Sequence, residues 1–136
     1  MAHRHGVKIL GTLIFEPRDD GSSDADLLKL LVGPLPSSQS AQPYGPASPS
    51  TTGSYSGLPI STYYADLLAE FAKCRGFDGY LLNVEIRLVG GTEHARALCH
   101  WTSLLTASMK RIIGAHAEVI WYGPSVTARA IKYIKF

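Results

Sequence analysis

Hydrophobic residues in this chain fall into segments that alternate between strand-like and helix-like spacing. Three short runs are almost continuously apolar and rich in β-branched or aromatic residues, which is typical of buried strands. They cover residues 7–16, 80–85 and 117–122. Three longer segments repeat apolar positions every three or four residues and begin near Ser or Thr, which predicts capped amphipathic helices. They cover residues 22–31, 62–74 and 92–112.

The helical repeats also predict which residues face the core. In the second helix the apolar positions are Tyr64, Leu67, Leu68, Phe71 and Cys74. In the third helix they are Leu98, Trp101, Leu105, Met109 and Ile112. Free thiols in helices usually act as small buried hydrophobes, so we expect Cys74 and Cys99 to be buried.

Strand, helix, strand, helix, strand at this spacing predicts parallel strands with right-handed crossovers, and hence an α/β fold. The first strand lacks polar alternation, so we expect both of its faces to be covered. Active residues in such folds lie where strands end. Glu16, Glu85 and Tyr122 each end one predicted strand, so we expect them to gather at one end of the sheet.

The segment from Gly33 to Pro59 has a different composition, because prolines alternate there with Ser, Gly, Thr and Gln. It leaves almost nothing to bury, so we interpret residues 33–59 as a disordered surface insertion. The rest of residues 1–136 is expected to form a single domain.

The charge of the chain and the length of its apolar stretches narrow the class of partner and the location of the protein. Charged residues make up 18% of the 136 residues, the net charge is +2, and lysines and arginines are scattered. This pattern argues against binding to nucleic acid or to an anionic membrane surface and favours a neutral partner. Lys8 interrupts the first apolar run, and no stretch approaches the ~18 apolar residues of a membrane span. We therefore expect a reduced, cytoplasmic (cytosolic) protein, of unspecified oligomeric state.

The strand at residues 80–85 carries the clearest candidate chemistry. Side chains alternate along a strand, so Asn83 and Glu85 should point the same way, about 7 Å apart. The opposite face carries Tyr80, Leu82 and Val84. From residue type alone two interpretations stay open: an amide and a carboxyl that grip one substrate group, or a solvated strand end. Glu16 can equally be an ordinary polar strand terminus, and Tyr122 a boundary aromatic residue.

Other polar residues give weaker signals. His3 and His5 share a strand face, yet neither a third metal ligand nor a supporting partner is evident, so no metal is predicted. His94, His100 and His116 lack mutual metal spacing and are interpreted as surface or packing residues. Gly90-Gly91-Thr92 precedes a helix but lacks the lysine and glycine spacing of phosphate-binding loops, which favours a connecting turn. No cofactor is predicted.

Six short motifs occur in the order of a known family. They are His3-Arg4-His5-Gly6-Val7, Leu10-Gly11-Thr12, Gly76-Phe77-Asp78-Gly79, Asn83-x-Glu85, Trp121-Tyr122 and Ser125-Val126-Thr127. The chain thereby resembles the cytosolic endo-β-N-acetylglucosaminidases of glycoside hydrolase family 85. These enzymes are β/α barrels of the TIM type that cut the N,N'-diacetylchitobiose core of N-linked glycans. After Trp121-Tyr122 this chain has Gly123-Pro124, where the family usually has Asp.

The resemblance implies roles for individual residues. Glu85 matches the family's general acid/base, and Asn83 matches the amide that orients the substrate's 2-acetamido group. That group is itself the nucleophile, so hydrolysis proceeds through an oxazoline and retains the anomeric configuration. Tyr122 matches an aromatic hydroxyl that positions the acetamide. Residues that match further substrate contacts are Phe15, Glu16 and Thr127.

A complete β/α barrel needs about 200 residues or more, so this sequence predicts a partial barrel that is incomplete in this chain. Two hypotheses follow. In the first, the segment carries the catalytic strand of an endo-acting glycosidase whose partner is an N-glycan or glycoprotein. In the second, it is a truncated, inactive barrel fragment that acts at most as a binding or interaction module.

Overall fold

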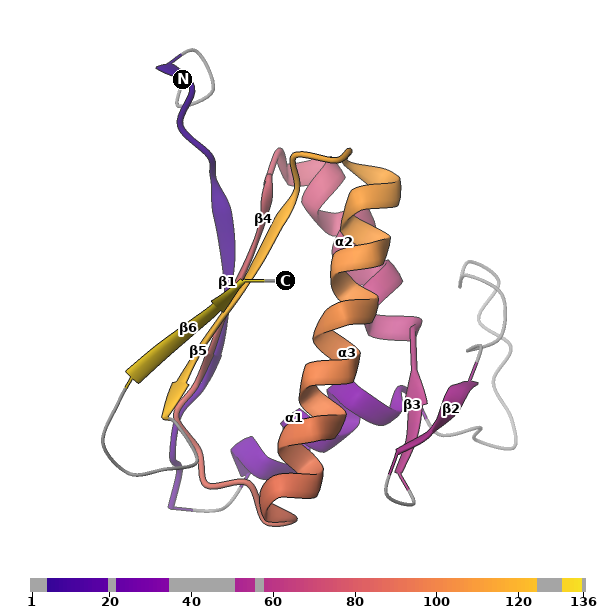
Figure 1. The fold of residues 1–136 in the computed structure, drawn as a ribbon, viewed down its shortest axis with the longest axis vertical. Helices are drawn as coiled ribbons and strands as arrows, with labels where there is room; N and C mark the ends of the chain where they lie inside the picture. Colours follow the sequence, from indigo (N-terminus) through magenta and orange to yellow (C-terminus); the bar gives the residue numbers. More distant parts are fainter. Residues whose placement is uncertain (1–4, 20–21, 35–50, 56–57, 125–130, 136) are drawn as a thin grey trace.

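The computed structural model describes residues 5–19, 22–34, 51–55, 58–124 and 131–135. Its main sheet has four strands in the order β1-β4-β5-β6, with all three helices on one face (Figure 1). The strands are β1 (Leu10–Phe15), β4 (Gly79–Val84), β5 (Glu118–Pro124) and β6 (Ile131–Lys135). The helices are α1 (Ser22–Val32), α2 (Tyr63–Arg75) and α3 (Gly91–Ile112). The predicted α/β class and the predicted helices are confirmed.

β1, β4 and β5 run parallel, as the alternation of strands and helices predicted. Helices α1 and α2 lie in the connection from β1 to β4, and α3 connects β4 to β5. Parallel strands joined by helices that cover only their outer face form a segment of a β/α barrel. The sheet order and the one-sided helix layer therefore agree with the predicted partial barrel.

The core lies between the sheet and the helices. From β4, Tyr80, Leu82 and Val84 enter it, each 2% exposed or less. From α3, the side chains of Leu98, Trp101, Leu105 and Met109 are fully buried, as the helical repeat predicted. Burial raises the pKa of Tyr80 to about 12, and its hydroxyl donates a hydrogen bond of 2.8 Å to the Leu68 carbonyl.

The opposite face of the sheet carries no helix in the described part of the chain (Figure 1). Thr12 is exposed there, and Ile14 is 55% exposed. The expectation that β1 is covered on both faces is therefore wrong for this structure. A barrel strand in isolation shows this pattern, because its apolar inner face is covered only by the other strands of the barrel.

Helix α2 buries a stripe that overlaps the predicted one only in part, because Tyr64 and Leu68 are half-buried against the core as predicted. Its core-facing residues are Ala65, Ala69 and Ala72, whereas Leu67 is 43% exposed and Phe71 47% exposed. Small side chains bring the helix axis close to its neighbours and leave the larger residues beside the contact. Cys74 is exposed on the same helix, so its predicted burial is wrong. Cys99 on α3 is partly buried, and burial raises the pKa of its thiol.

The predicted disordered insertion at residues 33–59 is wrong in part. Strands β2 (Thr51–Tyr55) and β3 (Leu58–Ser61) form an antiparallel pair on the far side of the helices from the main sheet (Figure 1). Leu58 packs against the core and Ile60 is fully buried. The hydroxyl of Ser61 accepts a hydrogen bond of 3.2 Å from the backbone of Tyr63, so the strand leads directly into α2. Positions 35–50 and 56–57 lie outside the described residues.

Strand β6 pairs antiparallel with β5 and was not predicted. Only residues 125–130 separate the two strands. A crossover to a parallel neighbour needs a dozen or more residues, so a connection this short allows only an antiparallel return. The edge of β5 that would receive the next parallel strand of a barrel is therefore occupied by the chain itself.

Candidate active site

The carboxyl ends of β1, β4 and β5 meet at the end of the sheet that lies next to α1 (Figure 1). Asn83 on β4 is paired with Ile14 on β1 and with Tyr122 on β5. Neighbouring residues in this pairing point to the same side of the sheet. The side chains of Asn83 and Tyr122 therefore project from the face that the helices leave open, opposite Leu82 and Val84.

Asn83 and Glu85 contact each other directly. The Asn83 Nδ2 atom donates a hydrogen bond of 3.1 Å to the Glu85 Oε1 atom. Glu85 is exposed, whereas Asn83 is half-buried. The Asn83 Oδ1 atom is buried and has no hydrogen-bond partner within the described residues. The pair therefore presents a carboxyl group that is open to solvent beside an amide oxygen that lacks a donor.

The backbone of Glu85 is held by the neighbouring strand. Its amide donates a hydrogen bond of 2.8 Å to the carbonyl of Phe15, which extends the pairing of β1 with β4 by one residue. The side chain of Phe15 packs against the helix-side core, because Phe15 pairs with Val84. The structure does not bring the Phe15 ring to the open face. Glu16, the next residue, is exposed beyond the end of β1.

The remaining predicted contacts lie around β5. Tyr122 is half-buried on the open face beside Asn83, so the strand pairing brings these two predicted residues together. Thr127 lies outside the described residues. The role of Thr127 stays a prediction from the family resemblance, whereas the strand pairing adds for Tyr122 a position beside Asn83.

Metal binding receives no support from the described part of the chain. Among those residues, no three histidine, cysteine, aspartate or glutamate side chains lie close enough to share a metal ion. His3 is outside the described residues and His5 is exposed.

None of the described helices is long and apolar enough to cross a membrane.

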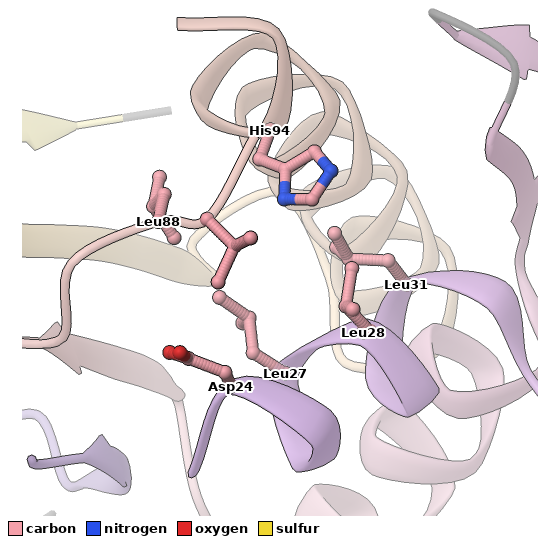
Figure 2. Close-up of a pocket in the computed structure, with 7 residues that line it drawn as sticks. Asp24, Leu27, Leu28, Leu31, Leu88 and His94 are labelled. Carbon is pink, nitrogen blue, oxygen red and sulfur yellow. The ribbon is translucent and has the colours of Figure 1, made fainter. Parts of the chain in front are cut away.

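The sequence did not predict that the loop from β4 to α3 holds Glu85 in place. Residues 85–90 form this loop, and a backbone hydrogen bond of 2.9 Å from Gly91 to Leu88 closes a turn at its end. Gly90-Gly91-Thr92 thus lies at a connecting turn, as predicted. Leu88 and His94 line a cavity beside α1, to which Leu27 and Leu31 contribute (Figure 2). Its volume is about 10 Å³.

Comparisons of the sequence with known proteins point to one enzyme family. The model of a family described as glycosyl hydrolase family 85 matches residues 1–135. Cytosolic endo-beta-N-acetylglucosaminidase 2 of Arabidopsis thaliana is 37% identical over 128 residues, which cover 94% of this chain and 14% of the relative. Cytosolic endo-beta-N-acetylglucosaminidase 1 of the same plant is 38% identical over 84 residues, which cover 62% of this chain and 8% of the relative. No solved structure gives a significant match.

The chain thus spans a small part of the curated relatives that it matches. The family match nevertheless includes every described strand of the sheet and both residues of the hydrogen-bonded pair on β4. Because the match runs along almost the whole sequence, this chain belongs to glycosyl hydrolase family 85.

Proposed function

We propose that this chain supplies the catalytic strand of an endo-acting glycosidase that cleaves the N,N'-diacetylchitobiose core of N-linked glycans. The observation that carries the proposal is the contact between Asn83 and Glu85 on the open face of the sheet. A carboxyl group and an amide held together can act on the glycosidic oxygen and on the neighbouring N-acetyl group at once. The names of the two plant relatives support this substrate class.

Asn83 orients the substrate in this proposal. The Asn83 Oδ1 atom, buried without a donor within the described residues, accepts a hydrogen bond from the N–H of the 2-acetamido group. The contact between Asn83 Nδ2 and Glu85 Oε1 fixes the orientation of the amide and leaves Oδ1 as its acceptor atom. The carbonyl oxygen of the acetamide is then directed at the anomeric carbon of its own sugar, which is the geometry that substrate-assisted hydrolysis requires.

Glu85 acts first as the general acid and then as the general base. In the first step the acetamide oxygen forms a bond to the anomeric carbon, the glycosidic C–O bond breaks, and the Glu85 carboxyl group gives its proton to the departing oxygen. In the second step water attacks the anomeric carbon of the protonated oxazoline, the bond from that carbon to the acetamide oxygen breaks and restores the 2-acetamido group, and the Glu85 carboxylate removes a proton from the water. Two inversions give net retention with a single protein carboxylate.

Further contacts are proposed at the strand ends. Tyr122, which is paired with Asn83, directs its hydroxyl toward the acetamide. Glu16 and Thr127 contact the sugar at neighbouring strand ends. Phe15 contributes through its backbone carbonyl, which holds the amide of Glu85. A cytosolic location for the parent protein is part of the proposal, because both relatives carry that word in their names.

Incubation of the purified chain with a labelled N-glycopeptide tests this function. We expect release of a glycan that leaves one N-acetylglucosamine on the peptide, and a loss of at least about a hundredfold in Glu85→Gln. Glu70→Gln makes the same chemical change on an exposed residue of α2 and should keep the wild-type rate. Release that persists in Glu85→Gln would contradict the acid/base role.

A binding module is the second candidate function. The observation that favours it is β6, which occupies the edge of β5 where a barrel would place its next parallel strand. The open face then lacks part of the wall that surrounds a barrel active site. A folded chain that binds the glycopeptide without releasing the glycan would support this function over hydrolysis.

A further inference from the structure

Glu85 is the first residue of the loop from β4 to α3, so the path of that loop sets where its carboxyl group lies. On the β1 side the loop is held by the hydrogen bond from Glu85 to the Phe15 carbonyl. Ile86, the next residue, is 5% exposed, and Leu88 packs against the core. The loop ends in the turn closed by the hydrogen bond from Gly91 to Leu88.

His94 on the first turns of α3 holds the other end of this loop. The backbone amide of Gly90 donates a hydrogen bond of 3.1 Å to the His94 Nδ1 atom. This bond satisfies an amide at the helix start, where no intrahelical acceptor exists. A backbone amide can only donate, so Nδ1 is the acceptor in this contact.

The imidazole ring also lies directly over Gly90. A Cβ atom on Gly90 would come within 2.1 Å of the ring carbon Cδ2 of His94, and within 2.3 Å of Nε2. The backbone of Gly90 has a φ of −82°, which any L-residue adopts. A Cβ atom at position 90 would therefore displace the ring of His94, although the backbone conformation would accept it.

The ring also helps to enclose the small cavity between the loop and α1 (Figure 2). Leu88 reaches this cavity from the loop, and Leu27 and Leu31 reach it from α1. The volume of about 10 Å³ leaves room for about one water molecule. Loss of the imidazole ring would enlarge the cavity and remove a contact that keeps the loop against α1.

We propose that His94 is a positioning residue for Glu85: its ring holds Gly90 and the preceding turn, and thereby keeps the Glu85 carboxyl group within hydrogen-bond distance of Asn83. The inference rests on the proposed function only for its catalytic meaning. The chain of contacts runs from His94 to Gly90, through the turn at Leu88 to Gly91, and along the loop to Glu85. His94 itself does not touch the substrate.

Nuclear magnetic resonance of the full chain tests the proposal without any need for turnover. The side-chain amide protons of Asn83 report the contact with Glu85, and hydrogen exchange at Gly90 reports the bond to His94. In His94→Leu we expect Gly90 to exchange about tenfold faster, as for a lost hydrogen bond. We also expect the Asn83 signals to shift toward those of Glu85→Gln, where the carboxylate is gone.

Two further variants separate positioning from general packing. His94→Asn keeps an acceptor near the place of Nδ1 and should restore both signals. His100→Leu makes the same chemical change further along α3 and should leave them unchanged. Unchanged Asn83 signals in a folded His94→Leu chain would overturn the proposal.

If His94→Leu does not fold, as judged by the absence of a cooperative thermal transition, Gly90→Ala tests the proposal instead. Its added methyl group pushes the ring away from the loop, so the Asn83 signals should shift there as well, and their constancy would overturn the proposal. An inactive wild-type chain in which these shifts still occur would sink the proposed function and leave the positioning role intact. A chain that releases the glycan but shows no shift of the Asn83 signals would support the proposed function and overturn the positioning role.

Discussion

At the scale of single residues, Asn83 has an energetic cost that its neighbours on β4 do not have. Its Oδ1 atom is buried without a donor in the described part of the molecule, whereas Leu82 and Val84 are buried as apolar side chains. An unsatisfied buried polar group costs about 1–3 kcal/mol. A group of this kind is unfavourable for folding, but a substrate that supplies the missing donor turns it into a binding contact.

Replacement of this amide tests whether its purpose is binding or folding. We expect Asn83→Leu to unfold at an equal or higher temperature than the wild type, because it removes the unpaired oxygen from an apolar setting. The same variant should lose glycan release. Thermal unfolding followed by circular dichroism, together with the glycopeptide assay, measures both. A destabilisation above about 2 kcal/mol would instead indicate that Asn83 has a structural role.

Ser108 provides the matched control for a satisfied buried polar group. Its side chain is on α3, and the hydroxyl donates a hydrogen bond of 2.6 Å to the Asp66 Oδ1 atom on α2. Ser108→Ala leaves that carboxylate with one donor fewer and should cost about 1–2 kcal/mol. Opposite responses of Asn83→Leu and Ser108→Ala would distinguish the unpaired amide from a paired hydroxyl.

At the scale of elements, α2 shows how a helical repeat can predict a helix correctly and its buried face only in part. Residues 65, 69 and 72 recur at helical spacing just as the larger apolar residues do, and the alanines form the stripe that packs. Hydrophobicity favours Leu67 and Phe71 for the core, but close helix packing favours the small side chains. The choice depends on the distance between α2 and α3, which no local pattern contains.

Enlargement of one alanine tests this assignment. Ala69 is fully buried, so Ala69→Leu has to displace packed neighbours and should cost about 1–3 kcal/mol. Leu67→Ser, on the stripe that the sequence pattern favoured, should change the free energy of unfolding by less than about 1 kcal/mol. Urea unfolding of both variants measures the difference. If Leu67→Ser lowered the free energy of unfolding more than Ala69→Leu, the result would support the prediction from the sequence that Leu67 faces the core.

The difference between local signals and tertiary packing also explains which elements the sequence predicted. Apolar runs predicted β1, β4 and β5, and the helical repeat of apolar positions predicted the three helices, because these signals are local. The predicted caps were less accurate: Thr62 makes no capping hydrogen bond through its side chain, and the N-cap of α3 is Gly90. β2 and β3 were missed because Ser, Thr, Gly and Pro dominate their surroundings, and because the strand pairing is not visible in composition. β6 was missed because its partner is set by the short connection at residues 125–130 and not by its own residues.

The candidate site was predictable for a related reason. Alternation along β4 placed Asn83 and Glu85 on one face, and the contact between them agrees with that prediction. The same rule separates the ring of Phe15 from this pair, because Phe15 pairs with Val84 and packs on the helix side of the sheet. The role of His94 was not predictable, because it depends on the ring meeting the backbone of Gly90 after the chain has turned.

At the scale of the whole molecule, the described structure leaves one side of the sheet uncovered (Figure 1). Ile14 is 55% exposed there, and Ile120 is partly exposed on the same face. β1 is an edge strand that pairs only with β4 among the described strands, and its residues 10–15 contain no charge and no proline. Natural edge strands usually carry a charged residue or a proline, which prevents them from pairing with other chains. β1 lacks both.

Self-association of the isolated chain is the expected consequence. An uncovered apolar face next to an unprotected edge promotes contact between copies. Ile14→Lys places a charge on that face and should shift the sedimentation profile toward the monomer. Val89→Lys also replaces an aliphatic residue that is 77% exposed, but this residue lies on the loop beside α1, so the profile should stay as in the wild type. A wild-type chain that remains monomeric at about 100 μM would show that the open face needs no cover, because exposed apolar patches of this kind otherwise drive association at micromolar concentrations.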